Sequence, residues 1–259
     1  AIWLLSNVKE HKTDCYSTRY NRWPVEFRNF LFLTLVYTPI SHTRITSRTP
    51  KSPGLIADSI FKKCLVKSNG KILLAALDSK GGPYSLFYFR AVLYWLKVLT
   101  EPPVFQEDGV NKRTGEMKEI KFADSKTRDA IVALLSSNLY SFYYTVWSSC
   151  QVVNSSDFYF PVDVPLLVKE RGHSFSRFTK TLIEGYQANS IIKERHYSAK
   201  GRTFVMHKQY FFLKKSKHII DNIDRILSEH YGFSDEELDF IINYDIKYRM
   251  GQNASDGTK

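Results

Sequence analysis

Two successive helices are predicted by residues 216–243, SKHIIDNIDRILSEHYGFSDEELDFIIN. Apolar residues at 219, 220, 223, 226 and 227 recur on one face of a helix that runs from about Lys217 to Tyr231. Ser216 is placed to cap the start of this helix, and Gly232 stands where a residue in the left-handed conformation commonly ends one. The spacing therefore predicts a complete amphipathic helix with both of its ends marked.

The second half of the same stretch predicts another helix directly after the first. Ser234 and Glu237 have the spacing of a capping box, in which each side chain accepts a hydrogen bond from the backbone amide of the other residue. Leu238, Ile241 and Ile242 then supply an apolar stripe. We expect a C-terminal helical hairpin at 216–250 with an acidic outer face, followed by a loose tail at 251–259.

Upstream of the hairpin, one segment predicts a long buried helix. It covers about 126–149, is apolar nearly all round, and has Asp124 or Ser125 in position to cap its start. A second, amphipathic helix is predicted over 174–189. Branched and aromatic residues favour strands over three segments, 71–77, 84–90 and 94–99. We therefore expect an α+β fold with a mixed β-sheet, in which residues 1–215 form one domain and 216–250 pack on it.

The net charge of +11 comes from two parts of the chain. Residues 1–70 and residues 191–217 each have a net charge of +7, whereas residues 218–259 have a net charge of −5. Within the first part, residues 41–54 contain no acid and end in Pro and Gly, which is typical of a surface loop. Within the second, a Lys-Gly pair separates two short stretches that can pair as strands, so residues 193–208 predict a basic hairpin.

A strongly basic surface with neighbouring hydroxyl and aromatic side chains favours binding to the phosphates of a nucleic acid. Arginine also pairs bidentately with a guanine edge. The alternative interpretation is that each run is an ordinary solvated face. The candidate DNA-binding residues are Arg44, Arg48 and Lys51 in the loop; Lys193, Arg195, Lys200, Arg202 and Lys208 in the hairpin; and Arg19 and Arg22 as outer candidates. For Arg19 and Arg22, packing against Trp23 is an equally good interpretation.

The sequence contains no recognisable catalytic motif. No Gly-x-Gly turn and no phosphate-binding Gly-Lys-Ser/Thr loop occurs, and residues 101–104, Glu-Pro-Pro-Val, lack the amide and the ring of the adenine methyltransferase motif. The seven histidines show no zinc-binding spacing. A magnesium-dependent nuclease remains an alternative, since two Glu-x-Lys pairs occur together; its residues would be Glu116, Lys118, Glu119 and Lys121.

The number of cysteines and the length of the apolar runs indicate the cellular compartment. The three cysteines, Cys15, Cys64 and Cys150, lie tens of residues apart and form no Cys-x-x-Cys pair, which favours reduced thiols in the cytoplasm. No apolar run approaches the roughly 18 residues that a membrane-spanning helix needs. We therefore expect no contact with a membrane.

Residues 216–251 closely resemble the C-terminal end of large adenine-specific DNA methyltransferases of restriction–modification and phage-defence systems, of the type IIG kind. Weaker matches to the same family follow the expected order along the chain, at 17–23, 85–98, 131–139, 154–157 and 160–163. One departure is that family members often have a Gly pair before the Tyr-Trp, where this chain has Ala91-Val92-Leu93.

The resemblance implies that this chain is the target recognition domain, which reads the DNA sequence, and that the methyltransferase domain has been left off. The chain itself would then hold no cofactor, and S-adenosylmethionine would bind in the missing catalytic domain. The implied partners are double-stranded DNA and the methyltransferase domain of the same polypeptide, in the cytoplasm of a bacterium or archaeon. A protein-interaction module with an acidic partner and an intact methyltransferase are the remaining alternatives.

Overall fold

The computed structural model of the chain describes residues 3–7, 13–23, 25–40, 45–77, 81–92, 94–199 and 201–251. Helices and strands are both abundant, so the expected α+β class is confirmed. The sheet arrangement differs from the single mixed sheet that we expected, because the described strands form three small sheets in which every pairing is antiparallel.

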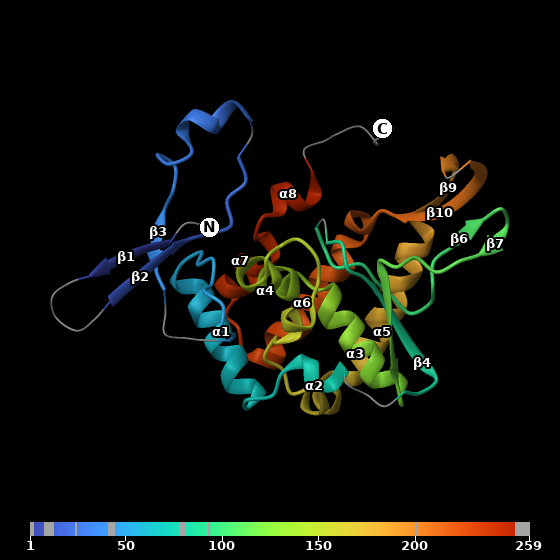
Figure 1. Ribbon diagram of the computed structural model, residues 1–259. Coiled ribbons are helices and arrows are strands. Elements are labelled where there is room, and N and C mark those ends of the chain that lie inside the picture. Colours follow the sequence, from blue (N-terminus) through green and yellow to red (C-terminus); the bar gives the residue numbers. More distant parts are fainter. Residues whose placement is uncertain are drawn as a thin grey trace.

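The core is built around two buried helices, α3 (Ser125–Ser136) and α4 (Asn138–Trp147). Longer helices pack around them, namely α1 (Leu55–Ser68), α5 (Val164–Ala188) and α6 (Lys217–Tyr231), as Figure 1 shows. A single cluster of buried side chains extends from Ala57 to Tyr244. The C-terminal helices therefore share one core with the rest of the body.

The single helix expected over 126–149 is instead two helices that meet at Ser137. Ser137 is extended, and its hydroxyl accepts a hydrogen bond from the backbone amide three residues on at 3.0 Å. The carboxylate of Asp224 on α6 accepts from the backbone amides of Asn138 at 3.0 Å and Leu139 at 2.9 Å. Because these acceptors satisfy amides that the start of a helix leaves free, the chain can begin a new helix inside the core.

The C-terminal helical hairpin is confirmed in detail. Helix α6 ends at Gly232, which is left-handed, and α7 (Asp235–Asn243) begins with the predicted capping box of Ser234 and Glu237. A third short helix, α8 (Ile246–Met250), follows. The prediction that Ser216 caps α6 is wrong: a turn of 3₁₀ helix, η3 (Leu213–Ser216), precedes α6, and the Ser216 hydroxyl forms no capping hydrogen bond. The expected tail lies outside the described residues after Gly251.

One sheet lies against the helical core, with strand order β5-β4-β8. Its strands are β4 (Tyr84–Phe89), β5 (Val98–Leu99) and β8 (Met117–Phe122). The strand expected over 94–99 is thus confirmed only at its end. The strand expected over 71–77 is wrong, because Leu73–Leu77 form the short helix α2, in which two of the leucines are buried.

Helix α5 begins earlier than predicted. The amphipathic pattern over 174–189 is the second part of a helix that starts after Asp163, whose side chain accepts from the amide of Leu166 at 3.2 Å. A proline in the first turn favours this start, since its missing N–H would have no partner there. Just before this helix, Asp157 forms a second capping box in the 3₁₀ turn η2 (Ser155–Phe158).

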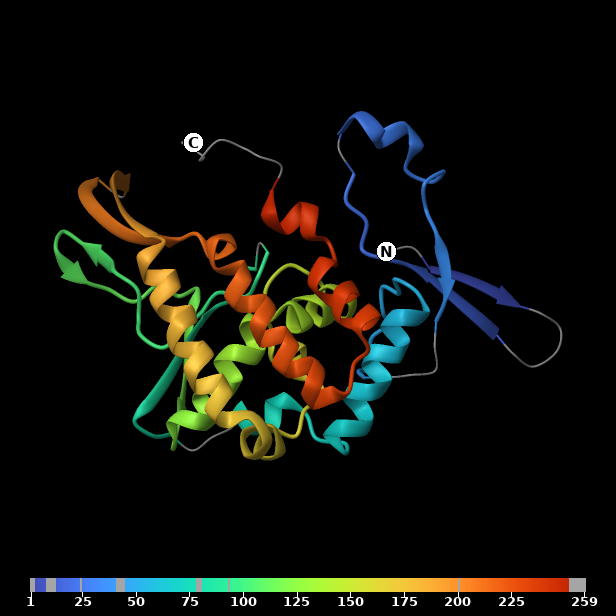
Figure 2. The same cartoon turned by 180° about the vertical axis from the view of Figure 1, so that it is seen from behind.

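The N-terminal part of the chain forms a projection outside the main core. It contains β1 (Trp3–Asn7), β2 (Thr13–Thr18), the 3₁₀ helix η1 (Val25–Phe30) and β3 (Tyr37–Pro39). None of the described residues of this projection belongs to the buried core cluster. Figures 1 and 2 show that it stands away from the body, on the other side of α8 from the third sheet.

The third sheet has the strand order β7-β6-β10-β9. Its short strands are β6 (Phe105–Glu107) and β7 (Val110–Asn111), and its long ones are β9 (Ser190–Ala199) and β10 (Arg202–Phe211). The basic hairpin predicted from the sequence is therefore confirmed as a two-stranded ribbon. Among the helices that the structure describes, none is both long enough and apolar enough to cross a bilayer.

Candidate nucleic-acid interface

Strands β9 and β10, here called the ribbon, extend from the end of α5 into solvent (Figure 1). Their ten paired positions run from Ser190 opposite Phe211 to Ala199 opposite Arg202. None of the ribbon side chains that the structure describes is fully buried. A hairpin that packs one face on a core would show such burial, so this one has the exposure of a surface that meets a partner.

The register places all four described basic residues of the ribbon on one face. Residues directly opposite in an antiparallel pair share a face, and residues two apart along a strand share it as well. Lys193 stands opposite Lys208, Arg195 opposite Met206, and Arg202 lies two residues from Phe204 on the same strand. This surface, the basic face, consists of Lys193, Arg195, Tyr197, Arg202, Phe204, Lys208 and Tyr210.

Aromatic rings support the cations of the basic face in two groups. Near the body of the protein, the ammonium groups of Lys193 and Lys208 lie 5.7 and 5.6 Å from the centre of the Tyr210 ring. Toward the turn, Tyr197 and Phe204 stack with their centroids 5.6 Å apart, and Arg202 lies 5.3 Å from the Phe204 ring. Rings at this distance attract cations without neutralising them.

Lys193 and Lys208 have no carboxylate partner within ion-pair distance among the described residues. Like charges directly opposite in a sheet repel and destabilise it. A third lysine, Lys97, lies behind them, 3.6 Å from the centre of the Phe89 ring. Burial and the charge of Lys208 lower the pKa of Lys97 to about 8. This concentration of positive charge favours an anionic partner.

Arg202 is less available than the two lysines. It forms ion pairs with Glu107 and, at 3.1 Å, with Asp108 in the turn between β6 and β7. The hydrogen bond from the Val205 amide to Asp108 and the Arg202 pair lower the pKa of that carboxyl. Arg202 therefore ties the ribbon to the neighbouring hairpin, whereas Arg195 is exposed and forms no ion pair with a described residue.

The opposite face of the ribbon has different chemistry. Glu194 lies there between two histidines, His196 and His207, each 3.1 Å from one of its oxygens. The only acid in the two strands thus points away from the basic face. The ribbon therefore has one side with the described lysines and arginines and one side with a carboxylate between two histidines.

The basic loop, residues 41–54, differs from the ribbon in how its cations are paired. Arg44 lies outside the described residues, as does Lys200 in the ribbon turn. Arg48 forms an ion pair with the buried Asp157 at 2.5 Å and donates to the Ser156 hydroxyl at 2.5 Å, so much of its charge is neutralised inside the fold. Arg48, Thr49 and Lys51 nevertheless line an open pocket of 490 Å³ at the end of α4.

The charge of Lys51 in that pocket is less neutralised than the charge of Arg48. Its ammonium donates to the Ser148 carbonyl and lies 5.9 Å from the Tyr20 ring, and no described carboxylate is within ion-pair distance of it. Burial is the main cause that lowers its pKa, and the charge of Arg48 acts in the same direction.

The outer candidates both contact the C-terminal helices. Arg19 forms an ion pair with Asp245, and its guanidinium lies 5.5 Å from the Tyr244 ring. Arg22 lies over the Tyr248 ring at 3.4 Å, not over Trp23 as the packing alternative assumed. These arginines and the loop thus form a second basic region, separate from the ribbon.

The nuclease alternative gains no support from the geometry. Glu119 accepts hydrogen bonds from Ser85 at 2.8 Å and from Arg113 at 3.1 Å, which engages it within the sheet. Among the described residues, no group of three or more His, Cys, Asp or Glu side chains is placed to hold a metal ion.

The places of Tyr210 and Lys97 near the charges of the basic face could not be identified from the sequence. Lys97 occurs in a segment expected to be an ordinary strand, and Tyr210 is one aromatic residue in a run of three. The register of the ribbon brings Tyr210 beside Lys193 and Lys208, and the fold of the loop before β5 brings Lys97 near Lys208. Alternation along the hairpin was the available signal for Tyr210, whereas nothing in the sequence pointed to Lys97.

Comparisons of this chain with protein-family models, with curated proteins and with solved structures found no match.

Proposed function

We propose that this chain binds double-stranded DNA and serves as the target recognition domain of an adenine-specific DNA methyltransferase. The observation that carries the DNA-binding part is the one-sided ribbon, with four cations and three rings on a single exposed face. The major groove of DNA admits a two-stranded ribbon, which β9 and β10 form toward the turn, beyond the residues that pair with β6. The lysine and arginine side chains of the basic face would then reach phosphates and base edges. The unpaired Lys193 and Lys208 are the principal anion-binding groups.

The methyltransferase part rests on the resemblance of residues 216–251 to that family. A methyltransferase must extrude its target base from the duplex, at a cost of a few kcal/mol, and needs a grip on the flanking DNA to do so. Under this proposal the ribbon supplies that grip, S-adenosylmethionine binds in the catalytic domain, and the complex works in the cytoplasm. Helices α6 and α7 belong to the scaffold, since both contribute to the common core.

Neutralising the two opposed lysines tests the proposal. The double variant Lys193→Gln/Lys208→Gln is expected to bind a short mixed-sequence duplex about tenfold more weakly, because two phosphate contacts are lost. The slope of log affinity against log salt should become shallower by about 2, at roughly 0.9 for each contact. Fluorescence anisotropy over about 50 to 200 mM salt measures both quantities.

The matched control changes the net charge equally at another place. Lys126 and Lys180 are exposed on α3 and α5, and neither forms an ion pair with a described residue. The variant Lys126→Gln/Lys180→Gln should retain nearly all duplex affinity. Equal losses in the two variants would show that only overall charge matters, and no duplex binding by the unmodified chain at low salt would favour the acidic protein partner instead.

A stability measurement separates lost binding from lost folding. Removing the repulsion between Lys193 and Lys208 should leave the melting temperature unchanged or slightly higher, since like charges opposite one another in a sheet are destabilising. A lower melting temperature would mean that the two lysines hold the ribbon together, and the weaker binding would then have a structural cause.

A further inference from the structure

A run of flat side chains crosses the surface beside α8. The Arg22 guanidinium lies 4.7 Å from the centre of the Tyr20 ring and 3.4 Å from the centre of the Tyr248 ring. The Tyr248 ring in turn lies 5.2 Å from the Tyr94 ring. These four residues, Tyr20, Arg22, Tyr248 and Tyr94, are here called the aromatic ladder. They come from three segments that are far apart in the sequence, so the fold assembles the ladder.

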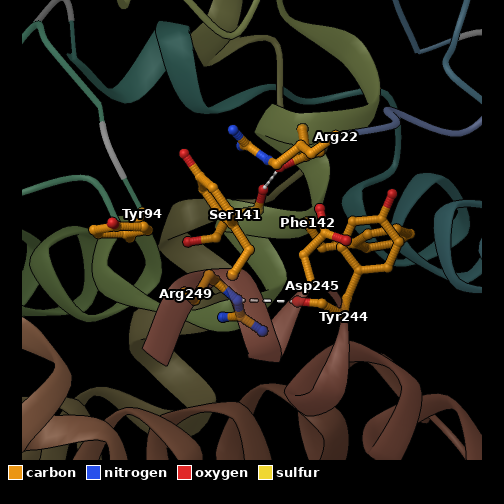
Figure 3. A pocket seen from close by; sticks show the side chains of 9 residues that line it. Arg22, Tyr94, Ser141, Phe142, Tyr244, Asp245 and Arg249 are labelled. Atoms are coloured by element: carbon orange, nitrogen blue, oxygen red, sulfur yellow. Dashed lines mark hydrogen bonds between the residues drawn. The ribbon is translucent and has the colours of Figure 1, made fainter. Parts of the chain in front are cut away.

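The ladder is exposed and lies between two hollows. Tyr94 is 44% exposed and Tyr248 is 39% exposed, and Arg22 is exposed as well. At the Tyr20 end is the pocket that contains Lys51. Along the rest of the ladder, Arg22, Tyr94 and Tyr248 line a small pocket together with Arg249. Figure 3 labels Arg22, Tyr94 and Arg249 around this pocket.

The ladder also occupies a central position. Helix α8, which carries Tyr248, lies between the N-terminal projection and the ribbon in both views (Figures 1 and 2). The Lys51 ammonium borders it at the Tyr20 end, and Asp245, which lines the adjoining pocket, is paired with Arg19. A strand of nucleic acid that reaches the ladder would therefore meet positive charge next to ring faces.

An aromatic side chain can stack on a base only when the face of that base is accessible. Paired bases in a duplex hide their faces in the stack and present only their edges, whereas unpaired bases stack on aromatic side chains and on arginine planes. Each base that stacks in this way strengthens binding by roughly fivefold to a hundredfold. We infer that the aromatic ladder binds unpaired nucleotides, with ring-on-base stacking at its end on Tyr94, which Tyr248 and Arg22 support from behind, and phosphate contacts from Lys51. The inference extends the proposed function to DNA whose pairing has been opened, yet the ladder and the ribbon are separate surfaces.

Removing the rings of Tyr94 and Tyr248 tests the inference. The variant Tyr94→Leu/Tyr248→Leu keeps apolar bulk but no ring, and is expected to bind a short single-stranded oligonucleotide at least about tenfold more weakly. It should lose a similar factor on a duplex that contains a mismatched bubble, and nothing on an intact duplex. Anisotropy titrations with the three oligonucleotides measure this pattern. The variant Tyr94→Trp, which keeps a ring at that position, should bind the single strand as well as the unmodified chain does.

Matched controls come from the same protein. Tyr84 and Tyr159 are 39% and 37% exposed and lie outside the ladder, so Tyr84→Leu/Tyr159→Leu should leave single-strand binding unchanged. If the double variant of the ladder fails to fold, Tyr94→Leu alone serves, because Tyr94 contacts the ladder only through Tyr248. Unchanged single-strand binding in the ladder variants, or an equal loss in the control pair, would overturn the inference.

The ribbon variants make the two proposals distinguishable. Lys193→Gln/Lys208→Gln should weaken binding to the intact duplex while most of the binding to the single strand remains. If the single strand binds through the ladder but no duplex binds, the ladder inference stands and the DNA-duplex proposal fails. If duplex binding depends on the ribbon but no variant affects binding of the single strand, the DNA-duplex proposal stands and the ladder inference fails.

Discussion

Replacement of Arg249 by methionine is expected to lower the free energy of unfolding by about 3 to 5 kcal/mol, because three buried oxygen acceptors would lose a charged donor. Arg249 on α8 is only 5% exposed. It donates to the carbonyls of Tyr244 and Ile242, each at 2.9 Å, and to the side-chain oxygen of Asn138. Burial lowers its pKa to about 10, and the nearby charge of Asp224 opposes that effect.

The loss has two physical components. Two carbonyls near the end of α7 would be left without this donor in a site closed to water. Asp224 would also lose its nearest compensating cation, although its three N–H donors from Asn138 and Leu139 would remain. Urea unfolding followed by circular dichroism measures the change. Lys247→Met on the exposed side of the same helix should stay within about 0.5 kcal/mol. A loss below about 1 kcal/mol for Arg249→Met would contradict the assignment of this buried network.

Stability is expected to fall as the pH rises from about 5 to about 8, because of Asp224. Burial raises the pKa of this carboxyl to about 7 in the folded protein, against about 4 in the unfolded chain. Between those values the folded state holds a proton that the unfolded state has released. Its stabilising contribution is therefore complete below about pH 4 and is lost as the pH rises through about 7. The expected decrease from pH 5 to pH 8 is about 3 kcal/mol.

Comparison with Asp224→Asn isolates this group from the other titrating residues. His230 is buried beside Glu170 and its pKa is lowered, so its contribution is lost as the pH falls and has the opposite sign. The difference between the two proteins removes that background, because asparagine at 224 does not titrate. The unfolding free energy of the unmodified protein minus that of Asp224→Asn should fall by about 3 kcal/mol from pH 5 to pH 8. A constant difference would show that Asp224 does not titrate in this range.

Local signals in the sequence were sufficient for the parts of the fold that short-range contacts determine. The left-handed Gly232, the capping box after it and the Lys-Gly turn of the ribbon all act within a few residues. The break at Ser137 was not predictable, because the carboxylate that caps α4 belongs to Asp224, 86 residues further along the chain. The helix at 73–77 was missed because a run of five apolar residues fits a buried strand equally well.

The candidate site shows the same division. The basic hairpin could be predicted from the sequence because its charges are contiguous, and alternation then places them on one face. The role of Arg48 could not be predicted, since its partner Asp157 is 109 residues away and is buried. Arg22 illustrates both cases, because a ring contact was anticipated but with Trp23 rather than with Tyr248.

The ribbon lies outside the buried cluster, and only Phe211 at its base packs against that cluster. Substitutions along its outer two thirds therefore alter contacts with a partner while leaving the folding of the body almost untouched. Under the proposed function, such a module can drift toward a new target sequence without first acquiring compensating mutations in the core, since selection on recognition and selection on foldability would act on different residues.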